Sequence, residues 1–197
     1  MSPLFLADRP ALDFLNTVLA PRIETIEFLS NGEGLLDWLE QAGLFEAAEI
    51  AAIRRQFSRE SLNAASVEAR SLREWFRGVV QQRERGLNTK LVAGIVRRLN
   101  PILARSARHS ALEVRGRALV CRERRLLTDA GQLLVPVAEA MSALLVEVDW
   151  SRIRRCANPK CTLWFRDSTK SARRLYCSAA VCGNRAKVAA YRARQQQ

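Results

Sequence analysis

Four cysteines near the C-terminus have the spacing of a metal site. Cys156 and Cys161 form one C-x4-C pair, and Cys177 and Cys182 form a second pair after an interval of fifteen residues. Two close pairs joined by a segment long enough for a tight hairpin can bring four thiolates to the corners of a tetrahedron, which is the geometry of Zn²⁺ in structural sites. The pattern therefore predicts a zinc finger, with Zn²⁺ as its cofactor.

Disulfides and an iron–sulfur cluster are the two alternative uses of these cysteines. The chain opens with MSPLFLADRP, which lacks the basic, apolar and small-residue segments of a secretory signal. We therefore expect a cytoplasmic protein, and disulfides are rare in that compartment. Ferredoxin-type clusters use more densely packed C-x2-C units, which this sequence lacks. Zinc is the favoured interpretation.

Positive charge is concentrated around the four cysteines. The chain has a formal net charge of +12, and residues 150–197 hold twelve Lys and Arg against one acidic residue, Asp167, which gives this segment +11. Residues 1–149 are nearly neutral, with twenty basic and nineteen acidic residues. This division predicts two domains, 1–149 and 150–197, and a polyanionic partner for the second.

The elements that must position these residues are mostly helical. Apolar residues recur at intervals of three and four over long stretches, which is typical of amphipathic helices. The stretch from residue 46 to 85 fits either one long helix or two with a break near residues 58–63. No apolar run is long enough to span a membrane, so we expect a soluble globular protein. The predicted helices cover residues 10–20, 31–42, 46–85, 89–106 and 133–148.

One segment of the N-terminal part has a different period. Residues 111–125 alternate between apolar and polar side chains on either side of Arg115-Gly116, which predicts a β-hairpin. Cys121 lies in this apolar run, and we expect it to be a buried small hydrophobe. The only histidine, His109, has no nucleophile motif around it, and we expect it to be exposed or capping. The lack of such a motif argues against an enzyme, and so does a zinc ion whose four coordination positions are all taken by cysteines.

The finger itself is predicted to be treble-clef-like, with a turn, a β-hairpin and a helix. The turn runs from Cys156 to Cys161, and the hairpin pairs residues 163–165 with 174–176 across a polar turn at 167–171. A helix over residues 179–194 begins at a Ser178 cap. The fold class is therefore mainly α, a helical domain with a small hairpin followed by this finger. The aromatic residues predicted to form the core of the finger are Trp164, Phe165 and Tyr176.

Several short strings in the finger resemble one known family. The chain reads RCANPKC over residues 155–161, then Phe165, Asp167 and Ser168, then CS at 177–178 and CGNRAK over residues 182–187. These strings resemble the bacterial CGNR zinc-finger family, which is named for the last of them. The resemblance covers about forty residues and implies a zinc-binding finger.

The N-terminal part resembles the domain that usually precedes such fingers. ALDFLNT over residues 11–17 is similar to the leading signature of the ABATE domain, which is assigned to stress-induced transcription regulators. Residues 35–44, which include Trp38 and Gly43, are similar to its next segment. With the finger, the resemblance covers nearly the whole chain and implies a transcription regulator.

The basic residues of the finger suggest a nucleic-acid surface, with DNA as the expected partner and RNA as an alternative. Lys and Arg side chains bind phosphates and displace counterions. In the predicted terminal helix, steps of 100° place one pair of basic residues on a flank and another pair nearly opposite, so one flank alone can face bases. The candidate contacts are Arg173, Arg174, Arg185, Lys187, Arg192 and Arg194.

The N-terminal domain offers a second candidate site. Asp13, Asn16 and Thr17 are polar residues spaced by three and four on an otherwise apolar helix. They could line a pocket for a small effector, or they could be satisfied by local hydrogen bonds. The sequence thus predicts a zinc-containing DNA-binding transcription regulator whose first domain senses a signal or forms a homodimer. The alternatives are an RNA-binding factor and a zinc-stabilised protein-interaction module.

Overall fold

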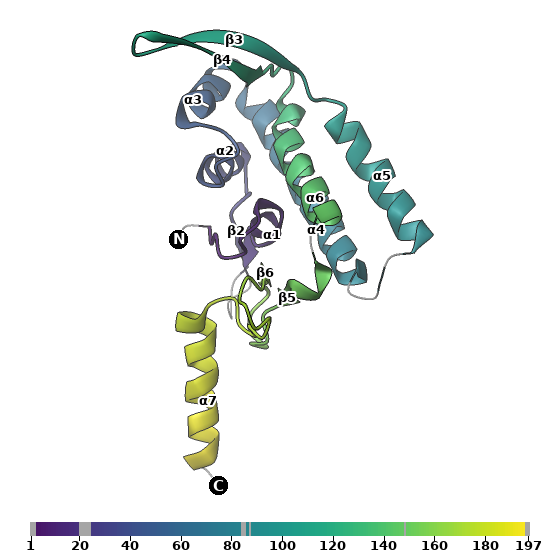
Figure 1. Cartoon of the computed structure of the whole chain (residues 1–197), viewed down its shortest axis with the longest axis vertical. Helices are drawn as coiled ribbons and strands as arrows, with labels where there is room; N and C mark the ends of the chain where they lie inside the picture. The colour runs from purple at the N-terminus through teal and green to yellow at the C-terminus, as the bar shows by residue number, and fades with distance from the viewer. Residues whose placement is uncertain (1–2, 20–24, 84–85, 87, 148, 196–197) are drawn as a thin grey trace.

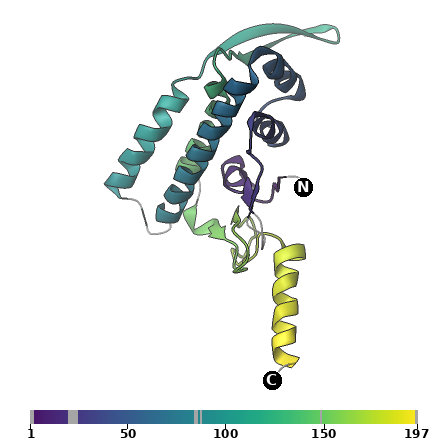
Figure 2. The ribbon, with the colours of Figure 1, turned by 180° about the vertical axis from the view of Figure 1, so that it is seen from behind.

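The structure is a computed structural model that describes residues 3–19, 25–83, 86, 88–147 and 149–195. It is mainly helical, as predicted, and the helices of the N-terminal part pack side by side while the last helix projects away from them (Figures 1 and 2). The helices are α1 (Pro10–Leu15), α2 (Gly32–Gln41), α3 (Ala47–Gln56), α4 (Arg59–Arg83), α5 (Thr89–Leu103), η1 (Ala130–Leu134), α6 (Val135–Glu147), η2 (Trp150–Arg152), η3 (Ala179–Gly183) and α7 (Asn184–Gln195).

Within the described residues the strands form three separate two-stranded antiparallel sheets, in which each strand pairs with the next one along the chain. The middle pair is a long ribbon, and the other two are short. Their bounds are β1 (Val18–Leu19) with β2 (Ile26–Glu27), β3 (Arg108–Arg115) with β4 (Ala118–Arg125), and β5 (Ile153–Arg155) with β6 (Trp164–Arg166).

Capping residues set where several helices begin. The side-chain oxygen of Asn31 accepts a hydrogen bond from the N–H of Gly34 at the start of α2, and Glu46 forms a reciprocal capping box with Glu49 at the start of α3. Ser58 accepts from the N–H of Ser61, so a new helix begins just after α3 ends. The stretch predicted over residues 46–85 is therefore two helices, α3 and α4, with the break close to the predicted position.

Two predicted helices are shorter in the structure. The helix predicted over residues 10–20 ends at Leu15, because the chain turns and the carbonyl of Thr17 accepts a hydrogen bond from the N–H of Phe28 at 2.9 Å. This bond leads into the pairing of β1 with β2, and it suits the β-branched Thr17 and Val18. The helix predicted to reach residue 106 ends at Leu103. The predicted helix ends at residues 20, 84–85 and 148 lie outside the described residues.

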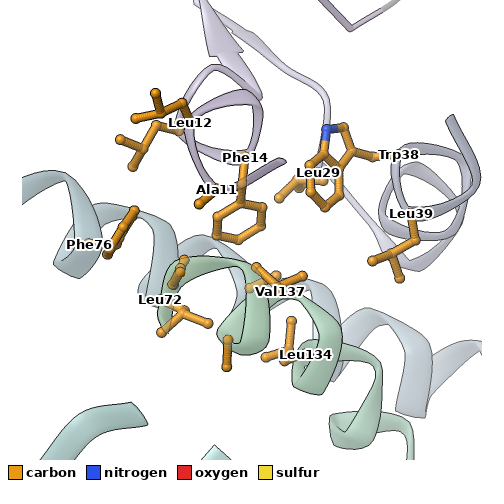
Figure 3. Close-up of a cluster of buried hydrophobic side chains, with 14 of the residues drawn as sticks. Ala11, Leu12, Phe14, Leu29, Trp38, Leu39, Leu72, Phe76, Leu134 and Val137 are labelled. Carbon is orange, nitrogen blue, oxygen red and sulfur yellow. The ribbon is translucent and has the colours of Figure 1, made fainter. Parts of the chain in front are cut away.

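The core of the N-terminal part surrounds α1. Figure 3 shows Phe14 and Ala11 of α1 facing side chains of α2, α4 and α6, and the rings of Phe14 and Trp38 lie with centroids 5.2 Å apart. Every residue of α1 from Ala11 to Leu15 is buried. A short helix of this kind is marginal alone, so its stability comes from packing on all sides. A segment that packs against α1 is therefore anchored in the core of the N-terminal part.

The finger shares this core. Ile153, Leu163, Trp164 and Phe165 belong to the same buried cluster as the side chains of α1, and β6 packs directly against α1. Trp164 and Phe165 are buried as predicted, yet they form an interface with the helical domain and not a core private to the finger. The finger is thus docked on the first domain at its strands, while α7 extends away (Figure 1).

The predicted hairpin is present as the β3–β4 ribbon, three residues longer than expected at its first strand. Leu112 lies opposite Cys121, and His109 is exposed within β3. Cys121 is also exposed, so the prediction of a buried cysteine was wrong. A two-stranded ribbon can pack against the rest of the chain with one face, and among the described residues Cys121 lies on the other, exposed face with Leu112 and Leu119.

Candidate metal centre

The first two cysteines stand at the two ends of a tight loop between β5 and β6. The N–H of Cys156 donates to the carbonyl of Leu163 at 2.9 Å and so continues the ladder of the two strands. Within the loop, the N–H of Cys161 donates to the carbonyl of Asn158 at 2.9 Å, and the N–H of Lys160 donates to the Asn158 side chain at 3.0 Å. Asn158 therefore closes the turn that brings the first two thiols together.

The second pair of cysteines stands at the start of the terminal helix. Cys177 precedes the wide turn η3, and Cys182 lies within it. Ser178 is the N-cap, as predicted: its hydroxyl accepts from the N–H of Val181 at 3.3 Å, and its carbonyl accepts from the N–H of Gly183 at 2.9 Å. Because η3 runs without interruption into α7, the position of Cys182 fixes the direction in which α7 leaves the finger.

The four sulfur atoms converge on one point. All four Sγ atoms lie within 4.8 Å of one another, and Sγ of Cys177 is 3.7 Å from those of Cys161 and Cys182. A tetrahedron with Zn–S bonds of about 2.3 Å has edges of about 3.8 Å. Three of the cysteines are buried, while Cys161 is half-buried. The donor set, the spacing and the burial therefore fit a structural Zn²⁺ bound by Cys156, Cys161, Cys177 and Cys182.

The thiols of Cys161, Cys177 and Cys182 lie so close together that they shift one another's pKa values. A hydrogen bond from Cys177 lowers the pKa of Cys161 to about 5. The same bond raises the pKa of Cys177, and burial raises that of Cys182 to about 11. One thiolate therefore forms readily, while further thiolates at such short range require a positive charge among them. A divalent cation supplies that charge.

Arg174 is part of the shell around the cysteines. Its guanidinium donates to the carbonyl of Tyr176 at 3.0 Å and to the carbonyl of Cys177, and it lies 4.5 Å above the ring of Phe165. These contacts hold the chain that carries Cys177. The sequence suggested Arg174 as a phosphate contact, but the structure uses its guanidinium inside the finger.

Asp167 organises the polar turn that follows β6. Its side chain is fully buried and accepts hydrogen bonds from the N–H and hydroxyl of Thr169 and from the N–H of Arg174 at 2.8 Å. Burial alone would raise its pKa, but these hydrogen bonds outweigh burial and hold the pKa below the ordinary value. The only acidic residue of the finger is thus a structural anion that shapes the segment before Cys177.

The strand pairing of the finger differs from the prediction. Residues 163–165 were expected to pair with 174–176, whereas β6 pairs with β5, with Phe165 opposite Arg154. The segment 174–176 forms no strand and instead contacts the loop of the first pair, where the N–H of Ala157 donates to the carbonyl of Leu175 at 2.9 Å. Strands of three residues leave little sequence signal to select a partner. The predicted order of elements was a turn, a hairpin and a helix. In the structure the turn with the first two cysteines connects the two strands of the hairpin, and the helix follows.

One side chain joins the finger to the helical domain. Nδ2 of Asn16 donates to the carbonyl of Trp164 at 2.8 Å, and the N–H of Trp164 donates to Oδ1 of Asn16 at 3.0 Å. Both residues are buried. A further bond links the N–H of Arg166 to the carbonyl of Ala7 at 3.2 Å. Asn16 thus extends β6 by mimicking a neighbouring strand, and sequence patterns gave no signal for this pairing because the two residues are far apart in the chain.

The side chains of the other two residues of the predicted effector site also form hydrogen bonds within the chain. Oδ1 of Asp13 accepts from the N–H groups of Leu6 and Ala7, and burial raises the pKa of Asp13 to about 6. The hydroxyl of Thr17 donates to the carbonyl of Phe14 and accepts from Arg73. Asp13, Asn16 and Thr17 therefore serve internal hydrogen bonds, which was the alternative to an effector site.

The remaining basic candidates lie on two sides of α7. No residue of α7 is buried within the part of the chain that the structure describes. A groove of about 400 Å³ lies between α7 and the first cysteine loop, and it is lined by Arg185, Arg192 and Lys160 among others. A second groove, of about 670 Å³, lies on another side of α7 and includes Lys187 and Arg173. Arg194 is exposed near the end of the helix.

Comparisons with known proteins agree with this architecture. A family model named ABATE, described as "Putative stress-induced transcription regulator", matches residues 8–148, and a model of the CGNR zinc finger matches residues 152–195. No curated protein matches the sequence. Among the described residues, no helix combines the length and apolar character needed to cross a membrane. The two matches confirm both resemblances, and with the clustered cysteines they confirm the zinc-binding finger.

Proposed function

We propose that this chain, which belongs to the ABATE family and ends in a CGNR zinc finger, is a transcription regulator that binds double-stranded DNA through that finger. The observation that carries the proposal is α7, an exposed basic helix that projects from a zinc-stapled base (Figures 1 and 2). A helix in this position has its surface free for a partner. The zinc ion is structural in this proposal, because four cysteines leave it no open position for catalysis.

The faces of α7 suggest how it meets DNA. With 100° per residue, Arg185 and Arg192 lie on one flank and Lys187 and Arg194 on the opposite flank. Ala186, which lies between the flanks on one side, is half-buried and lines both grooves beside the finger. The opposite side of the helix carries Asn184, Val188 and Tyr191, of which Asn184 and Val188 also line the groove beside the first cysteine loop, while Tyr191 lines neither groove and is 59% exposed.

With this arrangement, both basic flanks of α7 can contact DNA at the same time. The major groove of B-DNA admits an α-helix, and its walls are two phosphate backbones. In our proposal the flanks of α7 contact the two backbones, while Asn184, Val188 and Tyr191 face the base edges. Asparagine can read adenine with two hydrogen bonds, and an apolar side chain can contact a thymine methyl group. Lys160 and Arg173, beside α7, extend the phosphate contacts.

The same shape argues for duplex DNA over duplex RNA. The major groove of A-form RNA is deep and narrow and does not admit side chains on a helix. A zinc-stabilised protein-interaction module is the other alternative, and it predicts no binding to either nucleic acid. We include no effector in the proposal, because Asp13, Asn16 and Thr17 are engaged internally. A DNA-binding regulator would work in the cytoplasm of a bacterial cell.

Fluorescence anisotropy with the full-length, zinc-loaded chain tests the proposal. We expect binding to labelled random-sequence duplex DNA, with weaker binding to duplex RNA of the same sequence, and a logarithm of affinity that falls by about 0.9 per phosphate contact for each tenfold rise in salt. Arg185→Ala should reduce this slope by about one contact. Arg97→Ala, an exposed arginine on α5, is the matched control and should leave it unchanged. No binding to either duplex at low salt would overturn the proposal in favour of the interaction module.

A further inference from the structure

The β3–β4 ribbon lies at the end of the molecule opposite α7 (Figures 1 and 2), and one of its faces carries exposed apolar side chains. A two-residue turn at Gly116, where φ is +63°, joins the strands. Residues directly opposite one another share a face, so Leu112 with Cys121 and Val114 with Leu119 form one surface. The three aliphatic side chains of this outer face are 71–76% exposed.

The opposite face of the ribbon is better covered. Glu113 and Val120 are half-buried, and Glu113 is paired with Arg124. The exposed apolar side chains therefore lie on one face of the ribbon, because side chains alternate between the two faces along each strand. Their exposure is not explained by the projecting tip alone, since the other face is half-buried at Glu113 and Val120. Contiguous exposed aliphatic groups on a soluble chain mark a protein interface.

We propose that the outer face of this ribbon is a self-association surface, on which a second copy of the chain stacks its own ribbon in the antiparallel sense. The two-fold axis passes beside the pair Glu113–Val120, at the centre of the apolar surface. Stacking about this axis places Leu112 over Val114 of the partner subunit and Cys121 over Leu119 of the partner subunit. Every apolar side chain of the face then meets another.

Charge complementarity selects a second copy as the partner. Arg117 lies three residues from Val120 toward the tip, and Glu123 lies three residues from it toward the base. At about 3.3 Å per residue these distances are equal, so the antiparallel stack places Arg117 of one chain over Glu123 of the other. The Glu123 side chain is 69% exposed and lies on the outer face, where Arg108 of the same chain approaches one of its oxygens at 3.5 Å. A two-fold stack makes this pair twice.

The charges also exclude the parallel stack. That arrangement would bring the two tips together, with Arg115 and Arg117 of both chains adjacent, and like charges at an interface are unfavourable. The other arginines of the ribbon are already paired within the chain: Arg108 with Glu139 and Glu123, Arg125 with Glu139, and Arg122 and Arg124 with Glu46. The outer face therefore presents aliphatic groups between a basic tip and a base at which Arg108 and Arg125 are paired with Glu123 and Glu139, and this composition fits itself better than it fits a phosphate backbone.

Sedimentation equilibrium of the zinc-loaded full-length chain over a concentration series tests this surface. The face is smaller than a standard interface, so we expect a weak dimer that forms in the micromolar range or above. Leu119→Lys should raise the dissociation constant at least tenfold. Val146→Lys, at an 85% exposed position on α6, is the matched control and should leave it unchanged. A wild-type chain that is monomeric at about 1 mM, or a Leu119→Lys dimer as tight as the wild type, would overturn the proposal.

A charge exchange tests the antiparallel register. Arg117→Glu and Glu123→Arg should each weaken the dimer, and the double variant should restore it. Failure of the double variant to recover would overturn the register. A short bis-maleimide should also join two chains through Cys121, with Cys121→Ser as the negative control. Ribbon variants that weaken DNA binding but leave association unchanged would instead assign the ribbon to nucleic acid and overturn self-association.

Discussion

The side-chain amide of Asn16 pairs with the main chain of Trp164 across 148 positions of sequence, at 2.8 and 3.0 Å. One member lies just after the central helix of the first domain, and the other begins the strand β6 of the finger. Both are buried, with Asn16 only 2% exposed. This pair makes the position of the metal centre depend on the core of the helical domain.

Loss of the amide should destabilise the whole chain. Asn16→Ala leaves the N–H and the carbonyl of Trp164 buried without partners, which costs about 1–3 kcal/mol for each group. We expect a fall of about 2–5 kcal/mol in the free energy of unfolding, measured with a chemical denaturant. Asn100→Ala, at an exposed amide on α5, should change stability by less than about 0.5 kcal/mol. Equal stabilities of the two variants would contradict a structural role for the pair.

Removal of the metal should affect both domains. The sequence alone suggests an independent finger, so that Cys177→Ser would unfold only that part. Because Trp164 and Phe165 lie in the common core, we expect the thermal midpoint of the whole chain to fall by roughly 10 °C or more, since a chain of this size loses about 2–4 °C per kcal/mol. Calorimetry with zinc analysis checks this. Cys121→Ser should keep stoichiometric zinc, and an unchanged helical transition in zinc-free protein would contradict the shared core.

The carboxyl group of Asp13 should make stability depend on pH. Burial raises its pKa from 3.8 to about 6 in the folded chain, so folding favours the protonated form. Its contribution is fully present below about pH 4 and is lost as the pH rises through 6, a difference of roughly 2–3 kcal/mol. Asp13→Asn keeps the acceptor for Leu6 and Ala7 and removes this titration. The variant should be the more stable chain at pH 7–8, and the gain should vanish toward pH 4; parallel stability curves would contradict it.

Substitutions of the neighbouring residues Arg173 and Arg174 should affect different properties, DNA binding and zinc affinity respectively. Arg174→Ala removes the donors to the carbonyls of Tyr176 and Cys177, and loss of such outer contacts typically weakens metal binding 10–100-fold. Arg173→Ala should leave zinc affinity unchanged and reduce the salt slope of DNA binding by about 0.9. Competition with a chelating dye measures the first effect, and anisotropy measures the second. The reverse result would return Arg174 to the phosphate contacts.

The metal centre could be predicted from the sequence because four ligands of one type at fixed spacing leave few arrangements. Most helices were also predictable, since their apolar periodicity continues over many residues. The face of a two-stranded ribbon was not predictable: alternation shows that Cys121 and Leu119 share a face with Leu112 but not whether anything covers it. The strand partner of Phe165 was ambiguous for a different reason, because residues 153–155 (IRR) and 174–176 (RLY) are equally short and each holds few apolar side chains.

The contacts that join the two domains were the least predictable. Asn16 lies in a string that resembles the ABATE signature, yet its partner is a main-chain group, and main-chain groups are alike at every position. Arg174 carries the same charge as Arg173, and it differs by the ring of Phe165 beneath it and by the carbonyls of Tyr176 and Cys177 to which it donates. Sequence patterns specify side-chain chemistry, whereas these roles depend on which backbone atoms lie within reach.

The docked strand β6 limits how freely the finger can be exchanged between proteins. A finger transplanted onto an unrelated domain would carry the apolar surface of Trp164 and the unpaired edge that Asn16 now covers. A new host would therefore need a helix end with a suitably placed amide and a matching hollow beside it. The two parts of this chain carry separate family signatures, and they meet here at a buried surface where a substitution on one side must still fit the other.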